Sequence, residues 1–281
     1  MRLAWILAGL MLLVPALSQA ATQNKHAVAV IIGNKAYGDD TPSVDFAHND
    51  ADAMTKLTKA ERRRLRQSLG DWQAPRELLR RADALMDQLG VVELFNQAGV
   101  DFITEAWAAA TFAGYRQADA VRLVKEAAGW PDFEMRMGDD RQAWEFTEAL
   151  EIGRRRGDEF AENAAAIERG EAPVEDDPFE DWIARADQVP AILETAVRKK
   201  VGKRYGGGAR LLIYLNIQEF GARQSEIEAS FRESTAGGKG AFPEIWILWK
   251  ARAYRVWVGG EAGDVLPHET PTNPTRNASR W

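Results

Sequence analysis

Between residues 91 and 258 helical and strand patterns follow one another in an order that constrains the fold. Apolar periodicity near 3.6 residues predicts helices, and alternation or short apolar runs predict strands. The predicted elements are a helix at 100–115, three strands at 119–126, 132–137 and 142–149, a helix at 181–203, a strand at 210–217, a helix at 225–233 and a hairpin-like pair at 242–250 and 253–258. Gly138-Asp139-Asp140 predicts a turn, so the first three strands form a meander.

Two acidic residues stand at marked places in this order. Pro131-Asp132 opens the second strand, and Glu145 lies thirteen residues later on the third strand. Two carboxylates on adjacent strands form a hard oxygen site suited to Mg²⁺, which activates a water molecule and neutralises phosphate charge. The alternative is that Asp132 is a turn residue after Pro131 and that Glu145 is an exposed member of an amphipathic strand.

The element order and these acids are similar to the common core of the PD-(D/E)XK nuclease superfamily. The resemblance implies an α/β fold with a restriction-endonuclease-like mixed sheet flanked by helices. It also implies that Asp132 and Glu145 bind Mg²⁺, and that Glu105, on the preceding helix, supplies another acid. The expected activity is hydrolysis of nucleic-acid phosphodiesters, with nucleic acid as the partner.

The chain departs from the family at the lysine that follows the second acid by two residues, where it has Thr147. Family members with a displaced lysine take one from the next helix, and Lys199, Lys200 and Lys203 are the candidate catalytic residues there. An ammonium group must lie near the scissile phosphate to assist. Without one, the same fold is a non-catalytic domain used for binding.

The first twenty residues have the order of a secretory signal. Arg2 precedes an apolar stretch over residues 3–17, and Ser18-Gln19-Ala20 predicts cleavage after Ala20. The apolar stretch is shorter than the ~20 residues of a spanning helix, so we expect a secreted or periplasmic protein without a stable membrane anchor.

Composition narrows the chemistry further. The chain has no cysteine, which excludes disulfides, thiolate catalysis and Cys-ligated zinc. Its net charge of −6 argues against a protein that coats nucleic acid non-specifically, yet it is compatible with an enzyme that contacts a few phosphates through local basic clusters. The sequence predicts no oligomeric state.

An apolar β-branched run, VAVIIGN, is followed by the loop KAYGDDTPSVDFAHNDADAM. This stretch resembles the first strand, loop and helix start of the bacterial caspase-like peptidases (the peptidase C14 family), which cleave peptide bonds with a His/Cys dyad. The family's later strands have no counterpart, and the chain has no cysteine to activate. An active cysteine peptidase is therefore excluded. The alternative overall identity is a caspase-family relative without peptidase activity.

The predicted organisation is a signal peptide at 1–20, a caspase-like fragment at 21–57, a helical linker at 58–90, a nuclease-like domain at 91–258 and a disordered tail at 259–281. Two basic clusters have two interpretations each. Arg62, Arg63, Arg64 and Arg66 form either a solvated helix face or a basic docking surface. The run at 154–156 either binds phosphates or pairs with Asp158, Glu159 and the acidic loop after them.

Overall fold

The structure is a computed structural model that describes residues 57–124, 131–153, 156–170, 179–203, 205, 208–217, 223–250, 252–263 and 267–268. The predicted signal peptide, the caspase-like stretch before Leu57 and the arginines at 154 and 155 lie outside these residues. No helix among the described residues is long and apolar enough to cross a membrane.

The chain divides into two compact units. One comprises Met1–Met54 and Asn163–Pro173, and its described part is the helical and turn segment 163–170. The other comprises Thr55–Glu162 and Val174–Trp281 and contains the sheet. Helix α6 (Arg156–Glu168) runs across the division in sequence, and it was not predicted from the sequence.

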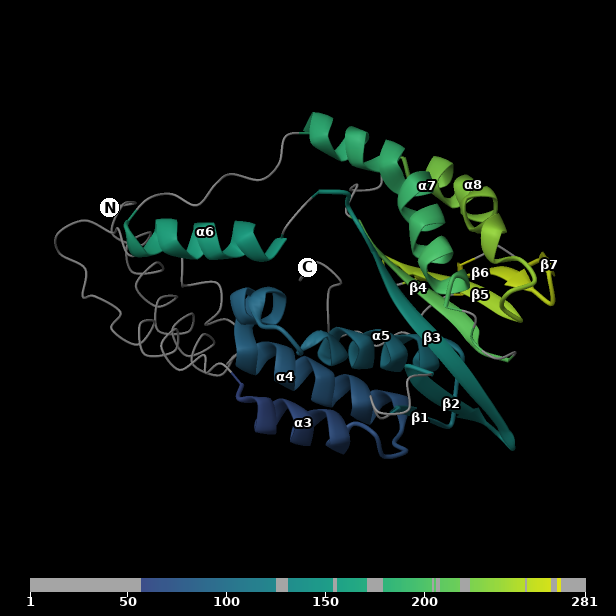
Figure 1. The fold of residues 1–281 in the computed structure, drawn as a ribbon, viewed down its shortest axis with the longest axis horizontal. Helices are drawn as coiled ribbons and strands as arrows, with labels where there is room; N and C mark the ends of the chain where they lie inside the picture. Colours follow the sequence, from purple (N-terminus) through teal and green to yellow (C-terminus); the bar gives the residue numbers. More distant parts are fainter. Residues whose placement is uncertain are drawn as a thin grey trace, which may run out of the picture. The chain divides into compact units, whose positions relative to one another are not determined.

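A mixed β-sheet forms the centre of the second unit (Figure 1). Its strands lie side by side in the order in which they occur in the chain. The first three strands are antiparallel to one another, β3 pairs with β4 and β4 with β5 in parallel, and β5 pairs with β6 antiparallel. The main strands are β1 (Ala120–Leu123), β2 (Phe133–Met137), β3 (Asp140–Leu150), β4 (Arg210–Asn216), β5 (Glu244–Trp249) and β6 (Arg252–Val258).

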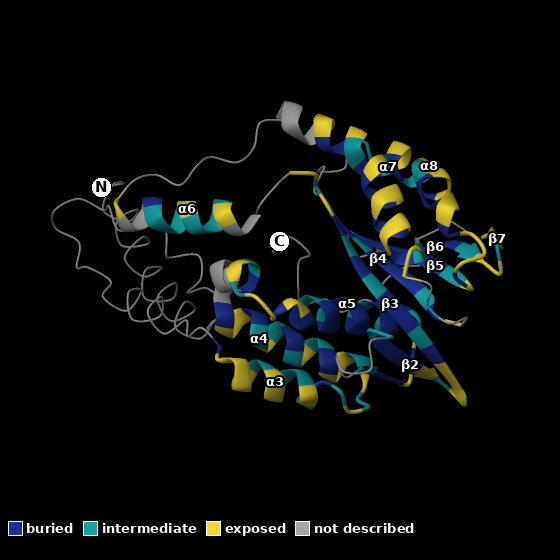
Figure 2. Ribbon diagram, in the orientation of Figure 1, coloured by how far each residue is buried: buried dark blue, intermediate teal, exposed yellow. Residues whose placement is uncertain are grey.

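Helices cover both faces of the sheet. Helices α3 (Lys59–Ser68), α4 (Pro75–Asn96) and α5 (Asp101–Tyr115) lie on one side, and α7 (Phe179–Val201) and α8 (Gln224–Thr235) on the other (Figure 1). This arrangement explains the apolar sequences of β4 and β5, because both of their faces are buried (Figure 2).

Alternate residues along the strands serve two separate cores. Leu212 and Trp246 pack with Trp144 and Phe112 of α5 in the first core, where the Phe112 ring lies edge-on to both tryptophans. Leu211 and Ile213 of β4 point to the second core, beneath α7 and α8. The predicted α/β class, with a mixed sheet flanked by helices, is therefore confirmed, and the predicted helix and strand segments match in order.

The segment predicted as a helical linker, 58–90, is helical but belongs to the packed body. Thr58 and Glu61 form a capping box that starts α3, and the chain then turns into α4. Leu69, Leu78 and Leu89 from this segment are fully or almost fully buried in the same core as α5. Its arginine-rich sequence reflects one solvated side of the helices, while the leucines face the core.

The predicted disordered tail is ordered at its start. Gly259 and Gly260 both have positive φ, as a two-residue hairpin turn requires, and return the chain to pair β7 (Glu261–Ala262) with β6. Strand β8 (Pro267–His268) also pairs with β6. The prediction of disorder over all of 259–281 is therefore wrong for these residues.

Replacing Leu78 with alanine tests whether α4 is part of the body. We expect Leu78→Ala to lower the free energy of unfolding by about 2–5 kcal/mol, because the side chain is fully buried. Ile152→Ala, at a residue that is 64% exposed, should change it by no more than about 0.5 kcal/mol. Equal, small effects of both substitutions in urea unfolding would show that α4 is a detached linker.

Candidate functional site

A lysine from α7 joins two carboxylates at one edge of the strand meander. The Lys200 Nζ atom donates hydrogen bonds to Glu145 Oε2 at 2.8 Å and to Asp132 Oδ2 at 3.1 Å. The Lys200 side chain is 8% exposed, Glu145 2% and Asp132 29%. Buried charges in proteins require such partners, because desolvation of an unpaired ion is costly.

The sheet register brings the two acids together. The Asp132 backbone N–H donates to the Trp144 carbonyl at 3.0 Å, next to the Phe133–Trp144 pair of β2 and β3. The Phe146 N–H in turn donates to Asp132 Oδ2 at 2.7 Å. Asp132 therefore has a local structural role beside its contact with Lys200, as a turn residue would.

Glu145 lies on the face of β3 that turns toward α7. It is the Cα partner of Leu211, which packs in the second core, and its neighbour Trp144 packs in the first. The interpretation of Glu145 as an exposed strand residue is wrong, since the residue is 1% exposed.

The phase of α7 separates the three candidate lysines. Lys200 continues the buried row of Val189, Leu193 and Ala196, and Lys199 and Lys203 are exposed. Neither of the exposed lysines has a described ion pair with Asp132 or Glu145. The structure therefore brings only Lys200 to the acids.

A third acid, Glu105 of α5, lies near enough to Asp132, Glu145 and Lys200 to interact with their charges. Its residue is buried, and Glu105 Oε2 lies 3.6 Å from Arg66 Nη1 of α3. Glu105 Oε1 and Glu145 Oε1 are buried atoms without a hydrogen-bond partner among the described residues. Glu105 thus lies near the ion-paired site without contacting Lys200 in any described hydrogen bond or ion pair, and Arg66 lies beside it.

Burial changes the proton affinity of these groups. Burial, and then the Asp132 charge, raises the pKa of Glu105 to about 8, although Arg66 opposes the rise. Burial also raises the pKa of Glu145, against the effect of its hydrogen bond from Lys200. Burial by itself would lower the pKa of Lys200, but the Asp132 and Glu145 carboxylates outweigh it and raise that pKa. Lys200 is therefore an ammonium at neutral pH.

Tyr205 and Arg66 belong to the site, although sequence reasoning did not assign them there. Burial and the nearby Glu145 raise the pKa of Tyr205 to about 12, and the Lys200 ammonium lies 5.7 Å from its ring centre. Tyr205 follows α7 in a short loop, and Arg66 comes from a helix before the predicted domain. No spacing rule connects either residue with the acids.

The three acids fit a hard divalent cation in their chemistry. Carboxylate oxygens are the ligands that Mg²⁺ prefers, and the buried Glu105 Oε1 atom has no hydrogen-bond partner among the described residues. Across the described residues, however, no three acidic or histidine side chains are already arranged around a single metal position. In this arrangement the Lys200 ammonium supplies the positive charge between Asp132 and Glu145.

Comparisons with protein-family models, curated proteins and solved structures find no match to this chain.

Replacing Glu105 tests its unusual proton affinity. The folded-state pKa of about 8 lies above the ordinary 4.5, so between these values the folded chain binds more protons than the unfolded chain. Stability contributed by the protonated form is then lost as pH rises toward 8. We expect Glu105→Gln to remove this loss. At about pH 8 the free energy of unfolding of the variant should be higher than that of the parent by more than about 1 kcal/mol.

The difference should nearly vanish at about pH 4.5, where the folded parent already carries the proton. Glu148→Gln is the matched control, because Glu148 is on the same strand and is hydrogen-bonded to Asn216. Urea unfolding at several pH values measures both variants. A Glu105→Gln variant with the parent's pH dependence would contradict the raised pKa.

Proposed function

We propose that the chain is a Mg²⁺-dependent nuclease that hydrolyses nucleic-acid phosphodiester bonds at the site formed by Asp132, Glu145, Glu105 and Lys200. The observation that carries the proposal is the buried Lys200 ammonium, hydrogen-bonded to the carboxylates of two adjacent strand segments. Perturbed titratable groups held together by desolvation and specific charge partners are typical of functional sites.

The fold supports the proposal at a second level. We propose that this fold is a restriction-endonuclease-like core. The elements of such a core are a helix, a three-stranded meander, a second helix and a parallel strand. They correspond here to α5, the strands β1 to β3, α7 and β4. In such a core, acids from the second and third strands lie on neighbouring strands, as Asp132 and Glu145 do where β2 begins beside β3.

Lys200 replaces the lysine of the family's motif, whose position is occupied here by Thr147. Thr147 is buried on the same face of β3 as Glu145, where it cannot supply a charge. The Lys200 ammonium, from the facing helix, lies 2.8 Å from the Glu145 carboxylate. Because its pKa is raised, Lys200 acts as a charged hydrogen-bond donor and not as a base. Its role is to stabilise negative charge on the phosphate in the transition state.

Asp132, Glu145 and Glu105 are the residues that would hold Mg²⁺. When bound, the cation lowers the pKa of a coordinated water molecule and neutralises phosphate charge. Glu105 must lose its proton to serve as a ligand, and at neutral pH the neutral form predominates because its pKa is about 8. Arg66 favours the ionised form of Glu105, which prepares this acid for its role.

A non-catalytic domain of the same fold is the second candidate, and Thr147 is the observation that favours it. In this case the bridge from Lys200 to Asp132 and Glu145 is a structural ion pair that fastens α7 to the sheet. The two candidates differ in one respect that can be measured, which is cleavage.

The cleavage assay uses the purified chain with single- and double-stranded DNA, in the presence of Mg²⁺ and after chelation. We expect cleavage only with the metal, and a loss of roughly 100-fold or more in Asp132→Asn and in Glu145→Gln. Glu148→Gln should cut at the parent's rate, because its hydrogen bond to Asn216 lies elsewhere on β3. Absence of cleavage by the folded parent would leave the binding domain as the function.

Export and a caspase-like origin for the opening segment remain predictions, and both concern residues that the structure does not describe. An exported nuclease would act on nucleic acid outside the cytoplasm. The absence of any cysteine still excludes thiolate peptidase chemistry at every position of the chain.

A further inference from the structure

Helix α3 concentrates positive charge in a chain that is otherwise acidic. Its sequence KAERRRLRQS holds five basic side chains and one acid, while the net charge of the chain is −6. The acid, Glu61, accepts hydrogen bonds from the Thr58 N–H and hydroxyl at 2.8 and 2.6 Å. Because the Glu61 carboxylate is hydrogen-bonded to Thr58 in the capping box, it leaves the positive charges of α3 largely uncompensated.

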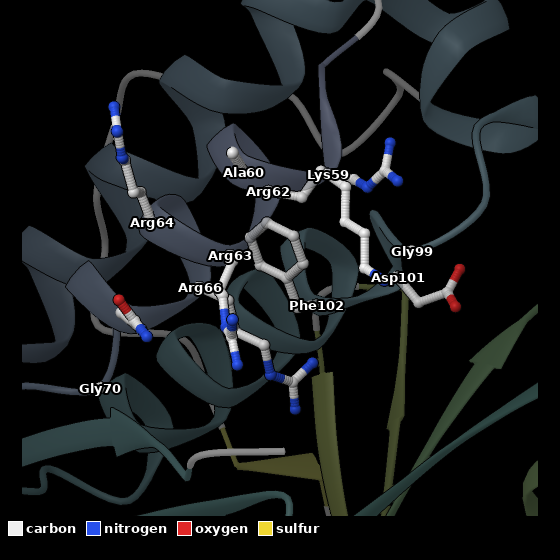
Figure 3. Close-up of a pocket in the computed structure, with 11 residues that line it drawn as sticks. Lys59, Ala60, Arg62, Arg63, Arg64, Arg66, Gly70, Gly99, Asp101 and Phe102 are labelled. Carbon is white, nitrogen blue, oxygen red and sulfur yellow. The ribbon is translucent and has the colours of Figure 1, made fainter. Parts of the chain in front are cut away.

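These side chains surround a hollow of about 1030 Å³ at the junction of α3 and α5. Figure 3 shows the Phe102 ring amid the lining side chains, with Arg64 pointing away from it. Among the described residues, no carboxylate forms an ion pair with Lys59 or Arg63, and both are exposed. The hollow is lined by Lys59, Ala60, Arg62, Arg63, Arg64, Arg66, Gln67, Gly70, Gly99, Asp101 and Phe102.

The hollow approaches Glu105 from two helices, α3 and α5. Arg66 lines the hollow and lies 3.6 Å from Glu105, and its Nε atom is buried without a partner among the described residues. Asp101 and Phe102, which also line the hollow, precede Glu105 by about one turn of α5. A ligand that contacts Asp101 or Phe102 in the hollow would therefore lie about one turn of α5 from Glu105.

We infer that the cationic side of α3 holds the phosphate backbone of the nucleic acid and leads it to the cluster of Glu105, Asp132, Glu145 and Lys200. Guanidinium groups bind phosphates through paired hydrogen bonds, and clustered arginines suit a chain of phosphates better than a single small anion. A ten-residue helix is about 15 Å long, which corresponds to roughly four phosphates of one duplex strand.

The inference rests on the proposed function for the identity of the ligand, so binding is measured separately from cleavage. A short fluorescein-labelled DNA, single- or double-stranded, is titrated with the purified chain in EDTA, where metal-dependent cleavage cannot occur. We expect Lys59→Gln/Arg63→Gln to weaken binding roughly 20- to 60-fold at about 0.1 M salt. The slope of log K against log salt should fall in magnitude by about 1.4–1.8.

Arg76→Gln/Arg80→Gln is the matched control, since it removes the same charge from exposed positions on α4 that do not line the hollow. The control should keep most of the parent's affinity. Equal affinity of the parent and the α3 variant, or equal loss in both variants, would overturn the inference. So would binding of the parent to phosphatidylserine vesicles but not to DNA, which would make α3 a membrane-binding surface.

The outcomes for the two proposals are distinguishable. DNA binding that depends on α3, without cleavage in Mg²⁺, would keep this inference and reject the nuclease. Cleavage that is unaffected by Lys59→Gln/Arg63→Gln at limiting DNA would keep the nuclease and reject α3 as its substrate surface.

Discussion

The hydrogen bonds from the Lys200 ammonium to Asp132 and Glu145 are the interaction on which the site and its surroundings depend. Two carboxylates near one another in a buried place repel, and each is costly to desolvate. The ammonium offsets both effects, so the end of α7 is held against the sheet by charge as well as by the apolar contacts of Ala196 and Val197. The β2–β3 register and the phase of α7 are thus coupled through one side chain.

Glu105 shows the opposite condition, in which a buried acid is only partly compensated. Its contact with Arg66 is 3.6 Å, its other oxygen has no partner among the described residues, and its pKa is raised to about 8. A buried polar group without a partner lowers stability and persists where function requires it. We interpret Glu105 as a group kept ready for a cation, with Arg66 linking it to the phosphates that α3 would hold. The same arginine therefore belongs to the acidic cluster and to the basic surface.

Periodicity predicted most of the helices and strands, because each buried element carries the period of its own geometry. Asp132 and Glu145 were predicted from their places on adjacent strands, whereas Glu105 and the three candidate lysines followed from the resemblance to the nuclease superfamily. The buried row through Val189, Leu193 and Ala196 would also have selected Lys200. Tyr205 and Arg66 could not be predicted, since both reach the site from segments whose position depends on tertiary packing. The core role of residues 58–90 was missed because arginines dominate their composition. Helix α6 was missed because its charged first residues were interpreted only as a phosphate-binding or ion-paired cluster.

The most direct test of the account is the rate of single-turnover DNA cleavage in Mg²⁺ by Lys200→Met, beside Lys199→Met, at a temperature where both variants are folded. We expect a loss of roughly 100- to 1000-fold for Lys200→Met, since a preorganised donor to the transition state is removed. We expect the parent's rate for Lys199→Met, because that side chain is exposed. A folded Lys200→Met variant that cleaves as fast as the parent would contradict a catalytic role and reduce the bridge between Asp132 and Glu145 to a structural ion pair.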